Sequence, residues 1–265
     1  EVAVGDRLLV GGAWLGPAEI GALAVLGLDH VPVFRRPVVA ILATGDEVVP
    51  VQSVPAAHQV RNSNAWALAA QVTAVGGEPC HCDILPDDAE GLRAGLTAAL
   101  DAADIVLTIG GVSKGTHDLV HEILAELGVE QVFHGIKLKP GKPAYCGTRR
   151  EQTAAGMQMP RKTYVFGLPG NPASAFTVFD LLVRPMLGWL AGDHIDDRAP
   201  LQARLRGQPF RKNWREQAIP ARLSTDPDGQ LVAELGSSKP SGDPFSLVGF
   251  SAYALIPADT EASDD

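Results

Sequence analysis

One stretch decides the fold class: Ile105-Val-Leu-Thr-Ile-Gly110-Gly-Val-Ser-Lys-Gly115-Thr-His-Asp118. A β-branched, apolar run that ends in glycines predicts a strand and a tight turn, and the acidic residue then opens an amphipathic helix. Glycine lets backbone N–H groups approach a ligand and tolerates positive φ, so such a turn can hold phosphate near the positive end of the helix dipole. A tight strand-to-helix turn also needs glycine for steric reasons alone, and the motif leaves both interpretations open.

Two further glycine turns favour the ligand interpretation. They are Lys139-Pro-Gly-Lys-Pro143 and Gly167-Leu-Pro-Gly-Asn-Pro172, and each lies beside an apolar, strand-like run. Three such turns predict a single site built from loops.

Strands and helices alternate along the chain from Pro37 onward. Strands are predicted at Val38–Ala43, Cys80–Leu85, Ile105–Ile109, Gln131–Leu138, Ala144–Gly147 and Tyr164–Gly167. This alternation predicts an α/β fold in three α/β/α layers, with a mostly parallel sheet covered on both faces. Because ligands bind beyond the carboxyl ends of such strands, Thr44–Glu47, Gly110–Gly115 and Gly167–Asn171 are expected to share one rim.

Helix boundaries follow from polar residues and prolines. Ser63 is a candidate cap for the first helix, and Asp87 with Glu90 forms a capping-box-like start for the second. Asn171 with Pro172 predicts the start of a later helix, which Pro185 should end or kink.

The pattern divides the chain into four parts. Residues 1–36 are expected to be the remnant of a preceding domain or linker, and residues 37–192 form the α/β domain. Residues 198–260 are expected to form a small all-β domain, because short strands at Leu201–Leu205, Gln217–Leu223, Gln230–Glu234 and Ala252–Ile256 alternate with turns. Residues 148–162 are expected to form a mobile loop and residues 261–265 a disordered acidic tail.

Composition narrows the class of partner. The 265 residues carry a net charge of −9, which argues against nucleic acid as a partner. Three cysteines do not make a disulfide framework, and no apolar run is long enough for a membrane span, so a cytoplasmic protein is expected. Basic side chains nevertheless gather around two glycine turns, which predicts a small-anion site, with a solvated strand end as the alternative. They are Lys114, Lys137, Lys139 and Lys142, with His117 and His134 nearby.

Acidic residues lie at the ends of the same strands. Asp46 and Glu47 can hold Mg²⁺ together with substrate oxygens, or can simply cap the next element. Asp87 and Asp88 are more easily explained as a helix start, whereas Asp118 lies at the mouth of the proposed site. Lys139 and Lys142 flank a rigid bend and could present two ammonium groups to one oxyanion.

Two other candidates are weaker. Cys80-His81-Cys82 is expected to be part of a core strand, because alternate strand residues point to opposite faces and the spacing is wrong for zinc. Ser113 lacks the G-x-S-x-G elbow of a catalytic nucleophile.

Six motifs in order resemble the molybdopterin molybdenumtransferase family (MoeA and the E domain of gephyrin). They are Val39–Val48, Arg61–Asn64, Leu85–Asp88, Gly110–Asp118, Leu138–Pro143 and Phe166–Ser174, and the resemblance weakens after about residue 200. It implies a molybdopterin-binding α/β domain and a small β domain. It also implies a transferase that inserts molybdate into adenylylated molybdopterin, with Mg²⁺, and releases AMP.

The resemblance assigns roles to individual residues. Glu47 and Asp118 would be catalytic and hold the metal, and Lys139 and Lys142 would be catalytic and hold molybdate. The substrate-binding residues would be Thr44, Gly45, Asp46, Asn64, Asp87, Asp88, Gly110, Gly111, Val112, Ser113, Gly115, Pro140, Gly141, Pro169, Gly170, Asn171, Ser174 and Arg211.

Departures from the family leave alternatives open. Asn62 stands where family members commonly have Asp, and Gly236–Ser241 is a reduced form of a family element. Family members also have a large N-terminal part and form homodimers with a shared site, so dimerisation and turnover of this chain stay open. The competing interpretations are a molybdopterin adenylyltransferase on the same fold, which is also a potential partner, and a non-catalytic scaffold.

Overall fold

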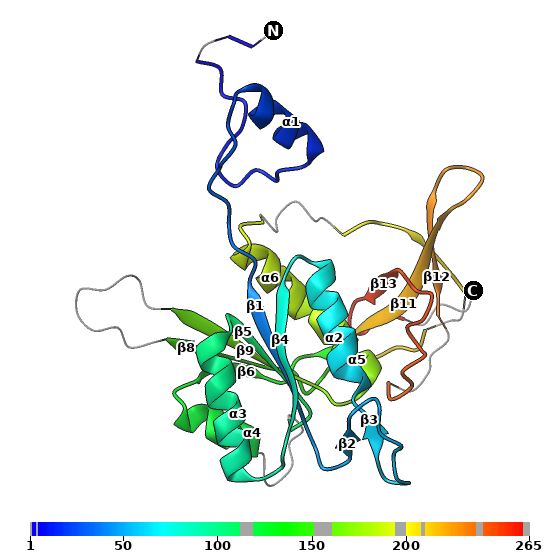
Figure 1. The fold of residues 1–265 in the computed structure, drawn as a ribbon. Coiled ribbons are helices and arrows are strands. Elements are labelled where there is room, and N and C mark those ends of the chain that lie inside the picture. The colour runs from blue at the N-terminus through cyan, green and yellow to red at the C-terminus, as the bar shows by residue number, and fades with distance from the viewer. Residues whose placement is uncertain are drawn as a thin grey trace.

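A computed structural model describes residues 2–3, 5–111, 119–150, 161–193, 200–207, 210–236 and 241–261. Within these residues, six strands form a sheet in the order β4-β1-β5-β9-β8-β6 (Figure 1). Strands β4, β1, β5 and β9 run parallel, while β8 is antiparallel to both β9 and β6. The six strands are β1 (Val38–Thr44), β4 (Glu78–Leu85), β5 (Ile105–Ile109), β6 (Glu130–His134), β8 (Tyr145–Arg150) and β9 (Lys162–Leu168).

Helices cover both faces of this sheet, which confirms the predicted three layers. Alternate residues of β1 face opposite layers, as a strand requires. Ile41 packs with the layer of α2 (Ser63–Ala74), α5 (Pro172–Val178) and α6 (Arg184–Leu190). Leu42 packs with the layer of α3 (Ala89–Ala102) and α4 (Leu119–Glu126).

A second sheet forms from the C-terminal part of the chain and carries its own small apolar core. Its strands are β10 (Arg204–Gly207), β12 (Leu231–Leu235), β11 (Glu216–Thr225) and β13 (Ala252–Ile256), and β7 (Leu138–Lys139) pairs with β11. The predicted strand Gln131–Leu138 is therefore wrong as one element. Gly135 has a φ of +90°, which interrupts the strand, so its first part joins one sheet and its end joins the other.

The expectation that no apolar run is long enough for a membrane span is wrong, because the helical run Pro172–Leu190 has that length and composition. Part of this run is buried in the core of the large sheet. Phe179 and Val183 are fully buried, and Leu187 is almost so. A π-helical turn, η1 (Phe179–Val183), precedes Pro185, and within it the Arg184 N–H bonds to the Phe179 carbonyl. The helix then continues to Leu190, so of the two predicted outcomes Pro185 does not end the helix, while the π-helical turn next to it is a distortion of the kind that accompanies kinks.

Two helix caps differ from the predicted ones. The Asn62 side chain accepts from the Ala65 N–H, so Asn62 rather than Ser63 caps α2. Asp88 rather than Asp87 caps α3, because its carboxylate accepts from the Gly91 N–H at 2.8 Å. In each pair, both residues are of a type that can cap a helix. The backbone conformation places Asn62 and Asp88 at the N-cap position instead of their neighbours.

The Cys80-His81-Cys82 strand is not a core strand. It lies in β4, at the edge of the sheet, where Cys82 is exposed and His81 is the extra residue of a bulge with a φ of +48°. Among the described residues, no three His, Cys, Asp or Glu side chains are grouped as a metal site.

The N-terminal residues lie away from the two sheets (Figure 1). None of the nine residues of α1 (Pro17–Val25) is buried. A connector leads into β1, where the Arg35 guanidinium makes two hydrogen bonds to the buried Asp104 carboxylate. A short parallel ladder of β2 (Val48–Val49) and β3 (Val60–Arg61) follows β1 and was not predicted.

Candidate functional site

Three strand-to-helix turns meet at one rim of the large sheet, as predicted. The Thr44 hydroxyl donates to the Ile109 carbonyl at 3.3 Å, which joins the ends of β1 and β5. The Gly110 N–H donates to the Leu168 carbonyl at 3.1 Å, which joins the ends of β5 and β9. A Cβ on Gly170 would lie 3.9 Å from the Gly110 Cα, so the third turn reaches the same place.

The glycine pair after β5 is required by the close approach of the strands. Gly110 has a φ of +84°, and a Cβ there would lie 3.0 Å from the Thr44 carbonyl oxygen. Gly111 has a φ of +63°, and its Cβ would lie 2.9 Å from Val120. Any larger residue would strain this turn. The predicted site residues that follow lie outside the described residues: Val112, Ser113, Gly115 and Asp118.

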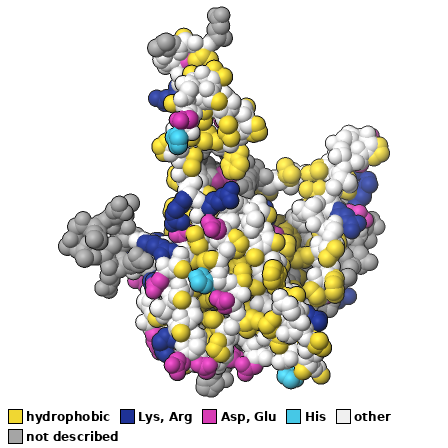
Figure 2. Space-filling view, viewed as in Figure 1, with side chains coloured by type: hydrophobic (Ala, Val, Ile, Leu, Met, Phe, Trp, Pro, Cys, Tyr) yellow, Lys and Arg dark blue, Asp and Glu magenta, His cyan; other side chains and the backbone are white. Residues whose placement is uncertain are grey.

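Carboxylates gather at one end of the rim, and Figure 2 shows acidic side chains along the lower edge of the molecule. The Glu47 carboxylate folds back over Gly45, whose absent Cβ would lie 2.6 Å from it. Burial, followed by the negative charges of Asp46 and Glu47, raises the pKa of Asp87. The structure therefore brings Asp46, Glu47 and Asp87 together, whereas the Asp88 side chain is engaged as a helix cap.

This acidic group suits a magnesium ion that shares its ligands with a phosphate. Mg²⁺ is commonly held by one or two carboxylates, with substrate oxygens and water completing the shell. A nearby cation would offset the part of the raised pKa of Asp87 that comes from the charges of Asp46 and Glu47, which add to the effect of burial. Among the residues that the structure describes, Asp46, Glu47 and Asp87 are not grouped as a three-ligand metal site, so an ion held here would need further ligands.

Basic residues lie on a turn that the second sheet holds in place. Lys139 ends β7 and pairs with Gln217 of β11, and a cis peptide bond joins Lys139 to Pro140. Gly141 has a φ of +122°, and a Cβ there would lie 2.6 Å from Val178. The Lys142 ammonium lies 5.9 Å from the centre of the Trp214 ring.

Arg211 is less closely tied to this turn than Trp214. Its side chain is exposed, and its carbonyl accepts from the Gln217 amide at 2.9 Å. The Arg215 guanidinium lies 5.3 Å from the Trp214 ring centre, so this aromatic residue contacts two cations. The sequence analysis did not single out Trp214, because its position beside Lys142 depends on the pairing of β7 with β11.

Amide side chains hold the turn that follows β9, at residues 167–171. The Asn64 amide donates to the Gly170 carbonyl at 2.8 Å, which ties α2 to the rim. Asn171 occupies the N-cap position of α5, but its amide donates to the Ser241 hydroxyl at 3.0 Å instead of capping the helix. Pro169 and Ser174 are buried, and Ser174 lies in the first turn of α5. Sequence reasoning missed Ser241 as a contact.

Comparison with known proteins identifies the family. The family described as a probable molybdopterin binding domain matches residues 40–189, which is more than half of the chain. The chain belongs to this molybdopterin-binding family. The matched region contains all three turns of the rim.

Curated relatives match this chain over a longer stretch than the family model does. A molybdopterin molybdenumtransferase of a Nostoc species is 38% identical over 188 residues, covering 71% of this chain and 41% of the relative. One from Staphylococcus aureus (strain MRSA252) is 32% identical over 257 residues, covering 97% of this chain and 58% of the relative. The chain thus spans about half the length of the curated relatives it matches.

Solved structures agree with the family assignment. The molybdopterin biosynthesis MoeA protein from Pyrococcus horikoshii has a TM-score of 0.75 and 32% identity, covering 95% of this chain and 57% of that one. Another MoeA structure, from Pyrococcus horikoshii OT3, has a TM-score of 0.74 and 27% identity, covering 98% of this chain and 59% of that one. Both sheets of the present structure fall within the covered share.

Proposed function

We propose that this chain inserts molybdate into adenylylated molybdopterin and releases AMP, as a step of molybdenum cofactor biosynthesis. One observation carries the proposal: a glycine-lined rim suited to phosphate has carboxylates at Asp46, Glu47 and Asp87. The turn that carries Lys139 and Lys142 leads into β8, whose first residue, Tyr145, pairs with Gly167 near the carboxyl end of β9. The names of the relatives as molybdopterin molybdenumtransferases support it.

The proposed chemistry needs positioning and charge neutralisation more than a nucleophile from the protein. The turns after β1 and β5 let the backbone approach the phosphates closely, and Lys139 and Lys142 neutralise the incoming oxyanion. When bound, Mg²⁺ would neutralise charge on the phosphates of the leaving AMP. Asp46, Glu47 and Asp87 would hold it, with Asp118 as the further ligand expected from sequence.

The test is AMP release from adenylylated molybdopterin, with Mg²⁺ and with or without molybdate. We expect molybdate-dependent release by this chain, and its loss in Asp118→Ala. Tight substrate binding without release would instead favour a binding or scaffold module. Formation of adenylylated molybdopterin from ATP would favour the adenylyltransferase.

We also propose that the protein forms a homodimer, in which residues 2–36 contact the second copy. Large apolar side chains in this segment face solvent, as Figure 2 illustrates, and Trp14 is 86% and Val25 89% exposed. Sedimentation velocity of the chain tests this proposal, and a dimer that Trp14→Ser dissociates is expected. We expect these reactions to take place in the cytoplasm.

A further inference from the structure

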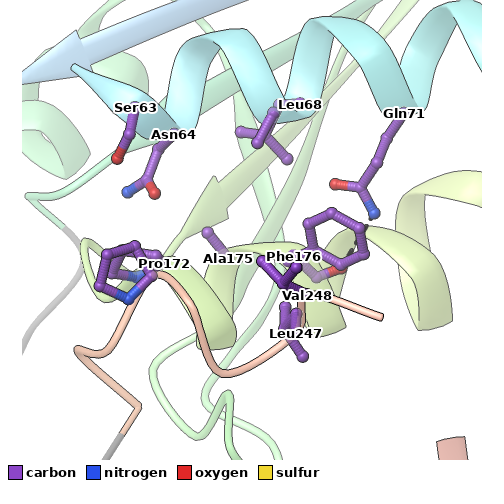
Figure 3. A pocket seen from close by; sticks show the side chains of 11 residues that line it. Ser63, Asn64, Leu68, Gln71, Pro172, Ala175, Phe176, Leu247 and Val248 are labelled. Carbon is purple, nitrogen blue, oxygen red and sulfur yellow. Dashed lines mark hydrogen bonds between the residues drawn. The ribbon is translucent and has the colours of Figure 1, made fainter. Parts of the chain in front are cut away.

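The pocket beside the rim offers no positive charge to an oxyanion. It has a volume of about 210 Å³ and lies between α2 and α5, where Figure 3 shows Leu68 and Phe176 among the side chains that line it. Asn64 lies at the end that contacts the rim, and none of the lining residues, all in the described part of the chain, is charged. The cations of the candidate site lie instead on the turn between β7 and β8, which carries Lys139 and Lys142.

Lys142 has an aromatic ring as its neighbour, where several other cations of the chain have a carboxylate. Arg93, Arg149 and Lys212 each form an ion pair with an acidic side chain. For Lys142 no such pair occurs among the described residues, and its Nζ lies 5.9 Å from the centre of the Trp214 ring. A carboxylate would neutralise the ammonium, whereas the negative face of an aromatic ring attracts it and leaves its full charge.

Backbone hydrogen bonds bring the lysine and the ring to the same place. The Ile136 N–H donates to the Lys142 carbonyl at 2.9 Å, which folds the turn back onto the residues before β7. Glu216 pairs with Leu138 in the parallel ladder of β11 and β7, so Trp214, two residues earlier, falls level with Ile136. The contact between the two side chains therefore follows from the register of this ladder.

The segment that carries the ring is held on both sides of Trp214. The Asn213 carbonyl accepts from the Asp259 N–H at 2.7 Å, and the Asn213 side chain accepts from the Arg215 N–H at 3.0 Å. The Arg215 guanidinium lies against the same ring and donates to the Leu138 carbonyl at 3.5 Å. Trp214 is 55% exposed, so a dissolved anion can reach the ammonium that lies over it.

We propose that Trp214 is a positioning residue of the anion site, whose ring holds the Lys142 ammonium in place without neutralising it. The inference rests on the proposed function, in which the oxyanion that meets this charge is molybdate. An ammonium has three N–H donors, so it can face the ring and the anion at the same time. Holding the long side chain before the anion arrives also reduces the conformational entropy that binding costs.

The experiment measures the dissociation constant of molybdate for the whole chain by isothermal titration, in a double-mutant cycle of Trp214→Leu with Lys142→Ala. We expect Trp214→Leu alone to weaken binding roughly two- to fivefold, as the loss of an exposed cation–π contact predicts. In the Lys142→Ala background the same substitution should change the constant by less than about 1.5-fold, because the lysine on which the ring acts is absent.

A conservative variant and a matched control separate this effect from packing. Trp214→Phe keeps an aromatic face and should bind molybdate more tightly than Trp214→Leu, which keeps only the apolar bulk. Trp189→Leu removes a ring of nearly the same exposure, 58%, which packs against Tyr164. We expect Trp189→Leu to leave the dissociation constant unchanged.

The outcomes separate this inference from the proposed function. Equal losses in Trp214→Phe and Trp214→Leu, the same loss with and without Lys142, or a wild-type chain that does not bind molybdate would each overturn it. Coupling between Trp214 and Lys142 in a chain that releases no AMP would support the inference while the proposed function fails. AMP release with an additive cycle would support the proposed function and overturn the role of Trp214.

Discussion

Individual glycines allow the turns of the candidate site to adopt backbone conformations and close contacts that other residues would strain. Gly110 and Gly141 both combine a positive φ with a neighbour closer than a Cβ tolerates. The motifs that contain them were visible in the sequence, but the reason for each glycine was not. Val178, which excludes a side chain at Gly141, is distant in sequence and comes from a helix on the sheet.

Gly141→Ala is expected to destabilise the chain by about 2 kcal/mol or more, since strain at positive φ adds to overlap with Val178. The matched control is Gly128→Ala, where φ is +81° but no atom lies within 4 Å of a Cβ. That change should cost only about 1 kcal/mol, from the left-handed conformation alone. Urea denaturation measures both, and equal losses would contradict the packing argument.

Lys142→Ala is expected to weaken molybdate binding about tenfold, because an ammonium group facing the anion is lost. Isothermal titration with molybdate measures the dissociation constant. Lys162→Ala is the control, since Lys162 also lies over an aromatic ring, at 4.8 Å from the centre of Tyr164, but begins β9 instead of lying in the turn between β7 and β8. Equal effects of the two substitutions would argue against a molybdate site at Lys142.

Asp87→Asn is expected to stabilise the chain at pH 7 by less than about 1 kcal/mol, because exposed charges are well screened. The pKa of Asp87 is raised in the folded chain, so folding favours its protonated form. The wild-type chain therefore loses stability as pH rises from the ordinary value of 3.8 through the folded value. Urea denaturation should show a higher free energy of unfolding for Asp87→Asn than for wild type at pH 7, and no difference at pH 3. A variant that is less stable than wild type at pH 7 would contradict an unfavourable charge at Asp87.

At the scale of elements, the parallel sheet was readable from the sequence because apolar runs and glycine turns alternate. The cap positions were less readable, since Asn62 and Ser63 are both good capping residues and only the backbone decides. The division of Gln131–Leu138 between two sheets could not be predicted, because it depends on pairing with Glu216 and Gln217, far along the chain.

Asn62→Ala is expected to cost about 1 kcal/mol, because the first turn of α2 loses its side-chain cap. Ser63→Ala should change the free energy of unfolding by less than about 0.5 kcal/mol, as for an ordinary surface position. Thermal denaturation of the two variants decides between the capping assignments. A larger loss of stability in Ser63→Ala than in Asn62→Ala would instead support Ser63 as the cap of α2.

At the scale of the whole molecule, Arg35 and Asp104 attach the N-terminal residues to the large sheet. Burial alone would raise the pKa of Asp104, but hydrogen bonds from Arg35 and the Val38 N–H, with the charges of Arg35 and Arg161, lower it. A lowered carboxyl pKa stabilises the fold above the ordinary value of 3.8, and that contribution is lost as pH falls through the folded value.

Asp104→Asn is therefore expected to cost about 2 kcal/mol at pH 7, from hydrogen bonds to a charged group, and much less at pH 2. The control is Asp101→Asn, because Asp101 is 63% exposed in its ion pair with Arg149 and should contribute less than about 1 kcal/mol. Urea denaturation at both pH values measures the difference. A constant loss across pH would contradict the ionic role of Asp104.

The two residues of β7 have a consequence for how the molecule can move. Because Leu138 and Lys139 are hydrogen-bonded into the C-terminal sheet while the chain on either side belongs to the large sheet, a rotation of one sheet against the other must carry the lysine with it. The spacing between Lys139 and the acidic end of the rim therefore depends on the angle between the two sheets. If Lys139 holds the oxyanion as proposed, a change that loosens only the small sheet is expected to alter molybdate affinity before the chain unfolds.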